Sequence, residues 1–200
     1  MSSEPKIATF PVTENLIITP QLRGAYDRAS RPELRETATR PLFEELFNEY
    51  FRCPSLSVFG EQQLDDNPQA VDITVGYYDN LPQPNLVFVL LAETKRHKVE
   101  SRGELESQLQ EYGDRYLNQE FGGLDVNPTM YGATAYGTKI RFFEFSRANG
   151  VFKDRTFSGN LHVNKEEAYW DLKTDGLKII PVMKEIWEFR KRLGQTTTAA

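Results

Sequence analysis

The chain has 200 residues, of which 39% are hydrophobic and 26% charged, and its formal net charge at pH 7 is −5. This composition is typical of one soluble globular domain with a sizeable core, and it excludes a disordered chain. The single cysteine excludes an internal disulfide and a cysteine-rich metal centre. No run approaches the roughly 18 apolar residues of a membrane span, and the first residues lack an apolar signal core. We therefore expect an intracellular protein, nuclear or cytoplasmic, that does not contact a membrane.

The domain organisation is expected to be simple. Residues 1–29 are expected to form an N-terminal arm. Within it, residues 1–13 contain prolines and small polar residues, which predict an irregular segment, and the short apolar segment 16–18 is expected to cover one edge of the core. One domain is expected over residues 30–194, because no linker in that range is long enough to separate two units and no internal repeat occurs. The polar residues 195–200 are expected to form a disordered tail.

The first helix of the domain is expected to begin at Ser30. Ser30, Pro32 and Glu33 have the spacing of a capping box with a proline in the first helical turn. The apolar pattern of this helix continues to Tyr50, and Pro41 must kink the helix or divide it into two pieces.

Three strands are expected next, over residues 55–59, 70–77 and 86–95. The third strand is apolar on both of its faces, which is typical of a strand in the middle of a sheet that is covered on both sides. The loop between the second and third strands is rich in turn formers, so these two strands are expected to form a hairpin. Such a hairpin brings Asp72 opposite Glu93 to within about one residue.

The second half of the chain predicts further helices and strands. In chain order they are a helix over residues 101–116, a strand pair over 131–145, a polar connection over 148–166, a short strand over 168–172 and an amphipathic helix that ends at 193. The last helix begins either at Asp175 or at Pro181. Together with the first half, this order predicts an α/β fold with a central mixed sheet flanked by helices.

Charged residues interrupt the apolar pattern where the third strand ends. Glu93 and Lys95 share a face, because successive side chains of a strand alternate. A carboxylate and an ammonium group at the end of a buried strand are costly unless they are used. With Asp72 they form the minimum set for a divalent cation that activates water. An ordinary Glu-x-Lys on a protein surface is the simpler and commoner alternative.

These residues resemble the motif of the PD-(D/E)XK nuclease superfamily, with Asp72 as the first acid and Glu93-x-Lys95 as the second part. The match is incomplete, because the residue before Asp72 is Val71 and not a proline. Gln108-x-x-x-Tyr112 follows Lys95 by 13 positions (108 − 95) and is similar to the helix motif of the RecB-like branch. The resemblance covers about residues 30–147, and the strand pair within it is similar to that of fungal RecB-like domains of unknown role.

The resemblance implies a restriction-endonuclease-like sandwich with an αβββαββ core and a site for Mg²⁺ or Mn²⁺. Asp72, Glu93 and the backbone carbonyl of Thr94 would bind the cation. Glu36 would be a further ligand, because Glu-x-x-Thr-Arg at residues 36–40 is similar to a motif in the first helix of type I restriction subunits.

The resemblance also implies which residues complete the catalytic group. Lys95 would orient the attacking water or stabilise the charge that develops on the phosphate. Gln108 and Tyr112 would hold the lysine and the nucleic-acid backbone in place. The simpler alternatives are that Tyr112 is an ordinary core aromatic and that Gln108 is its polar neighbour by chance.

The function that these observations predict is a metal-dependent nuclease. Its expected partner is nucleic acid, with DNA expected ahead of RNA. The basic stretch at residues 96–98 lies where a phosphate backbone would pass, although a solvated loop explains it equally well. The alternative function is a catalytically inactive binding domain on the same fold, which the acidic net charge favours. Neither His97 nor His162 lies near a recognisable nucleophile motif, which argues against a serine or cysteine hydrolase. The oligomeric state stays open, with a homodimer as one option.

Overall fold

The computed structural model describes residues 10, 13–31, 33–34, 38–51, 56–63, 70–78, 86–95, 102–121, 129–146, 151–154 and 168–196. Their helices and strands, in chain order, are α1 (Pro20–Ala29), α2 (Thr39–Phe51), β1 (Ser57–Gln63), β2 (Ala70–Tyr78), β3 (Leu86–Lys95), α3 (Arg102–Phe121), β4 (Thr129–Tyr136), β5 (Lys139–Ser146), β6 (Val151–Asp154), β7 (Trp170–Asp171) and α4 (Gly176–Thr196).

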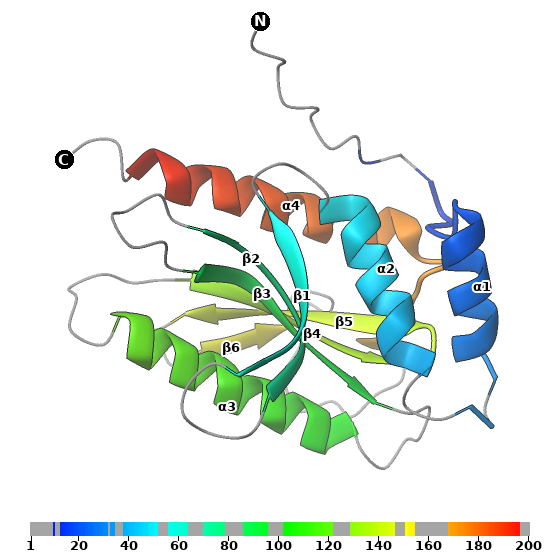
Figure 1. The fold of residues 1–200 in the computed structure, drawn as a ribbon, viewed down its shortest axis with the longest axis horizontal. Helices are drawn as coiled ribbons and strands as arrows, with labels where there is room; N and C mark the ends of the chain where they lie inside the picture. The colour runs from blue at the N-terminus through cyan, green and yellow to red at the C-terminus, as the bar shows by residue number, and fades with distance from the viewer. Residues whose placement is uncertain are drawn as a thin grey trace, which may run out of the picture.

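The strands form one mixed sheet in the order β1-β2-β3-β4-β5-β6, and β7 pairs with β5. Strands β3 and β4 are parallel, and α3 forms the crossover connection that a parallel pair requires. All the other pairs of neighbouring strands described are antiparallel. Helices α1, α2 and α4 cover one face of this sheet and α3 covers the other (Figure 1). The expected α/β fold with a mixed sheet between helices is therefore confirmed.

Two apolar cores fill the space between the sheet and its helices. The larger core joins α1, α2 and α4 to the sheet, and the smaller one joins α3 to it. Strand β3 contributes to both cores, with Leu90 and Ala92 on the larger side and Leu91 on the smaller side. This double burial explains why residues 86–95 are apolar on both faces, and it confirms the expected central position of this strand.

The N-terminal arm contains a helix that its composition does not predict. Residues 20–29 form α1, which begins where the Thr19 hydroxyl accepts the Leu22 N–H at 3.2 Å, with Pro20 in the first turn. Leu16, Ile17 and Leu22 are buried in the larger core. The burial of Leu16 and Ile17 agrees with the expectation that this segment covers part of the core. Helix α1 was not predicted because its apolar residues are few, and their burial depends on contacts with distant parts of the chain.

The expected helix start at Ser30 is also wrong. Ser30 ends α1, where its N–H donates to the Tyr26 carbonyl at 2.8 Å. Helix α2 begins only at Thr39, which places Pro41 in the first turn, where no kink results because a missing N–H costs little there. Phe43, Phe47 and Phe51 then stack along one face of α2 at a spacing of four residues.

The last third of the chain agrees with the expected elements except at β6 and at the end of α4, which continues to Thr196 and so includes the first two residues of the expected tail. Strands β4 and β5 are joined at Gly137, whose φ of 55° suits a glycine in a tight turn. Strand β6 lies inside the segment that we expected to be an irregular polar connection. Helix α4 starts directly after Asp175, whose carbonyl accepts the Lys178 and Ile179 N–H groups, so the earlier of the two expected starts is correct. None of the described helices is long and apolar enough to cross a membrane.

Candidate functional site

Strands β2 and β3 separate from each other at the two acidic residues. Their pairing runs from Tyr78 and Leu86 to Ile73 and Ala92. Beyond that point β2 continues against β1, up to Ala70, while β3 continues against β4, up to Lys95. Asp72 and Glu93 are the next residues after the last pair, so the expected register is confirmed. We call this opening, with Asp72 and Glu93 at its start, the β2–β3 fork.

Each carboxylate of the fork binds the backbone of the opposite strand. Asp72 Oδ2 accepts the backbone N–H of Thr94 at 2.8 Å and the Thr94 hydroxyl at the same distance. In return, Glu93 Oε1 accepts the backbone N–H of Asp72 at 3.3 Å. The two side chains thus replace the backbone carbonyls that would bind these N–H groups in a continuous ladder. Glu93 and Thr94 are 4% and 1% exposed, so this exchange takes place out of solvent.

Tyr112 of α3 lies on the same side of the sheet as Glu93, because Leu91, two residues before Glu93 on β3, belongs with Tyr112 to the smaller core. Its side chain is buried in the smaller core. Burial raises the pKa of its hydroxyl above the ordinary value, and the negative charges of Glu93 and Asp72 raise it further, against a smaller opposite effect of Arg115. The helix motif and the strand motif therefore lie on the same side of the sheet. Like any tyrosine of ordinary or raised pKa, Tyr112 is protonated at neutral pH.

The other expected site residues lie around the fork. Lys95 is half-buried, two residues beyond Glu93 on β3, and it stands opposite Tyr136 of β4. Gln108 is half-buried on α3, one turn before Tyr112, and its buried Oε1 makes no hydrogen bond within the described part of the chain. Glu36 and the basic residues 96–98 lie outside the described residues, so the structure does not place them.

The donor atoms at the fork suit a hard divalent cation. Carboxylate oxygens are the ligands that Mg²⁺ and Mn²⁺ prefer. Within the described residues, no group of three or more His, Cys, Asp or Glu side chains is arranged to hold a metal ion. Of the expected cation ligands, only Asp72 and Glu93 are acidic side chains within the described residues. Glu36 lies outside them, and Thr94 would bind through its backbone carbonyl.

A second polar group under α3 was not expected from the sequence. Arg141 of β5 is fully buried and forms an ion pair with Glu106 of α3 at 2.8 Å. Glu106 also accepts the hydroxyl proton of Tyr169 at 3.0 Å. The one signal in the sequence is the charge of Arg141 within an otherwise apolar run from Ile140 to Phe143, which is unusual for a buried strand.

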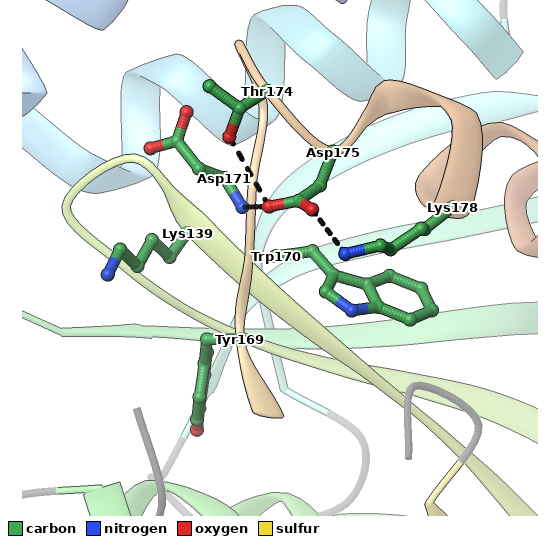
Figure 2. Close-up of a pocket in the computed structure, with 7 residues that line it drawn as sticks. All are labelled: Lys139, Tyr169, Trp170, Asp171, Thr174, Asp175 and Lys178. Carbon is green, nitrogen blue, oxygen red and sulfur yellow. Dashed lines mark hydrogen bonds and ion pairs between the residues drawn. The ribbon is translucent and has the colours of Figure 1, made fainter. Parts of the chain in front are cut away.

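A shallow pocket of about 390 Å³ lies where β5, β7 and the start of α4 meet (Figure 2). Its charged groups bind one another: Asp175 accepts the Lys178 ammonium at 2.6 Å and the Asp171 N–H at 3.0 Å. These bonds hold β7 against the beginning of α4, as the dashed lines in Figure 2 show. The walls of this pocket therefore have a structural role, and we assign the candidate site to the fork instead. The pocket residues are Lys139, Tyr169, Trp170, Asp171, Thr174, Asp175 and Lys178.

Comparison of the chain with protein families, with characterised proteins and with solved structures found no match.

Proposed function

We propose that this protein is a metal-dependent nuclease that hydrolyses phosphodiester bonds of nucleic acid, with DNA as the first substrate to test and RNA as the alternative. The observation that carries the proposal is the β2–β3 fork, where two strands open at Asp72 and Glu93 on the side of the sheet that Tyr112 of α3 covers. Such a group of acids at a strand opening, next to a lysine, has the composition of a two-carboxylate cation site.

The order of the elements supports a restriction-endonuclease-like sandwich as the finer description of the fold. Helix α2 precedes three antiparallel strands, α3 follows, and β4 returns parallel to β3 before the hairpin with β5. This is the αβββαββ order that the resemblance to the PD-(D/E)XK superfamily implies, and it runs over the same part of the chain.

In the proposed site, Asp72, Glu93 and the Thr94 carbonyl hold the cation. A bound Mg²⁺ or Mn²⁺ would supply a water of lowered pKa and would polarise the phosphate. Asp72 Oδ2 is already fixed by two donors of Thr94, so the remaining oxygen of its carboxylate is the one oriented for the cation. The burial of Glu93 keeps water from competing for its oxygens.

The lysine and the two residues of α3 have separate tasks. Lys95 shares the face of Glu93, so its ammonium group is placed to orient the attacking water or to stabilise the phosphate charge. Tyr112 is protonated at neutral pH, so its hydroxyl is available to donate a hydrogen bond to an anionic oxygen. Gln108, with a buried oxygen that no described residue binds, accepts a hydrogen bond from the lysine or from the substrate.

One observation favours the alternative, a binding domain without catalysis. The carboxylates of Asp72 and Glu93 already satisfy backbone N–H groups of the opposite strand, which is a sufficient structural reason for two acids at this point. In that case Lys95 would only compensate their charge.

Cleavage of labelled nucleic acids distinguishes the two functions. Single- and double-stranded DNA and RNA are incubated with the protein and Mg²⁺ or Mn²⁺, and Glu93→Gln is compared with the wild type. We expect cleavage by the wild type, and none by Glu93→Gln, which keeps an acceptor for the Asp72 N–H but loses the anionic ligand. Glu104→Gln, which removes an exposed carboxylate from the first turn of α3, is the matched control and should cut normally. Equal cleavage by Glu93→Gln and wild type would show that the activity comes from elsewhere.

A further inference from the structure

Under the first half of α3, strand β5 presents a charged side chain that solvent does not reach. Arg141 is 0% exposed, and its Nη1 donates to Glu106 Oε1 of α3 at 2.8 Å. The guanidinium group also lies over the ring of Phe143, 5.1 Å from its centroid. Glu106 is itself only 15% exposed. This ion pair joins α3 to the sheet inside the protein.

Two further side chains complete the group. The Tyr169 hydroxyl donates to Glu106 Oε1 at 3.0 Å. The Thr134 hydroxyl lies 2.8 Å from the Tyr169 hydroxyl. Because the single proton of Tyr169 is used for Glu106, Thr134 must be the donor in the second bond. We call Glu106, Arg141, Tyr169 and Thr134 the anchor group. It connects α3, β4, β5 and the residue before β7.

The strand register places the anchor group in line with the fork. Glu93 of β3 stands opposite Thr134 of β4, which stands opposite Arg141 of β5. Residues directly opposite in neighbouring strands point to the same face of a sheet. Glu93, Thr134 and Arg141 therefore form a row across three strands on the face that α3 covers. On α3, Glu106 precedes Gln108 by two residues.

Apolar contacts also hold α3 to the sheet. Leu105, Leu109 and Tyr116 already give α3 an apolar face. A buried ion pair loses so much hydration that a well-packed apolar pair often gives equal or greater stability. The ion pair restricts the position of α3 more than apolar contacts do. Glu106 Oε1 accepts two hydrogen bonds, and both keep good geometry in only a few positions of the helix.

A second contact fixes α3 on the other side of the motif. A Cβ added at Gly113 would lie 2.5 Å from the ring of Phe145, so the helix there touches the sheet with no space left. Gln108 and Tyr112 lie between Glu106 and Gly113. The two contacts thus enclose the part of α3 that faces the fork.

We propose that the anchor group is a positioning device, which sets the rotation and the axial position of α3 so that Gln108 and Tyr112 face the β2–β3 fork. Its effect on cleavage rests on the proposed nuclease function, whereas its effect on the position of α3 does not. The residues of the anchor group touch neither substrate nor cation in this proposal, and they act through Gln108 and Tyr112.

The test replaces the charged pair by apolar side chains in the double variant Glu106→Leu/Arg141→Met. Spin labels at Ser57 of β1 and Ser107 of α3, both exposed, report the position of the helix over the sheet in a Cys53→Ser background. We expect a folded protein whose label distance shifts or broadens by ~1–2 Å, as for helix shifts at packed interfaces. Cleavage should fall ~100-fold, because a displacement of this size is enough to disturb a catalytic group. Mn²⁺ affinity should stay unchanged, because its ligands lie on β2 and β3.

Glu44→Gln is the control. It removes one of the two ion-pair partners of Arg40, the other being Glu61, in a pair of 2.8 Å on α2 at the opposite face of the sheet, and should change neither the label distance nor cleavage. If the double variant does not fold, Tyr169→Phe decides, because it removes one hydrogen bond to Glu106 and should broaden the same distance. An unchanged distance in whichever of these variants folds overturns the proposal. If the wild type cuts no nucleic acid, the distance measurement still tests the position of α3, so the two failures are distinguishable.

Discussion

At the residue scale, a carboxylate oxygen in the fork stands where a backbone carbonyl stands in a regular ladder. Asp72 and Glu93 each accept a backbone N–H of the other strand. Replacement by alanine would remove this bond together with the charge, so a loss of activity would have two explanations. Asparagine and glutamine keep an acceptor oxygen and remove only the charge. These isosteric variants are therefore the ones that test the cation site.

Lys95→Ala distinguishes a catalytic lysine from a compensating one. If Lys95 acts on the water or the phosphate, cleavage should fall about 100-fold or more, as for the loss of one transition-state contact. Mn²⁺ affinity should be kept, because the ligands remain. Melting temperature, Mn²⁺ titration by calorimetry and cleavage rate are measured together on the same preparation.

If Lys95 only compensates the charge of the two acids, the result is different. Its removal takes a positive charge away from Asp72 and Glu93, and the free energy of unfolding should fall by about 1–3 kcal/mol. Suppose that the wild type cuts no nucleic acid with either metal and that Lys95→Ala melts at a much lower temperature. We would then conclude that the protein is a binding domain without catalysis.

At the element scale, the position of α3 depends on the absence of a side chain at Gly113. The ring of Phe145 lies between Gly113 of α3 and Gly132 of β4, and an added Cβ at either glycine would approach it to 2.5 Å. This ring is 1% exposed and has no space to move. We expect Gly113→Ala to lower the free energy of unfolding by about 1–3 kcal/mol, as overpacking of a core does. Urea unfolding monitored by circular dichroism measures this change.

The matched control for Gly113→Ala is Gly24→Ala. Gly24 lies inside α1, and no atom lies within 4 Å of an added Cβ. Alanine there should raise stability by ~0.5–1 kcal/mol, because glycine loses more backbone entropy in a helix. The double variant Gly113→Ala/Phe145→Leu should lose less than the sum of its single variants, since the two residues touch. A Gly113→Ala protein as stable as the wild type would show that α3 shifts without cost.

At the scale of the whole molecule, the sequence predicted what depends on local pattern. The double-sided apolar run of β3 and the turn formers before it were enough to place Asp72 opposite Glu93. The Ser30 capping box failed because a serine with proline and glutamate after it also suits a helix end, where the Ser30 hydroxyl donates to the Asp27 carbonyl. The anchor group could not be predicted, because Glu106 is 35 residues from Arg141 and 63 from Tyr169, and no local pattern connects them.

The last prediction couples the cation site to the stability of the entire fold. The proposed ligands lie on β2 and β3, which separate at the fork, so a cation held by both would join strands that would otherwise part at that point. A ligand that binds only the folded state adds about 2.7 kcal/mol of stability at a free concentration of 100 times Kd. In a chain of this size that corresponds to a rise in Tm of roughly 5–10 °C.

We expect this rise for the wild type when Mn²⁺ is titrated during thermal unfolding. Lys95→Ala should show it too, whereas Asp72→Asn and Glu93→Gln should not, because each lacks one anionic ligand. A wild-type Tm that stays constant up to millimolar Mn²⁺ would contradict a cation site at the fork. The two carboxylates would then serve only as hydrogen-bond acceptors between β2 and β3.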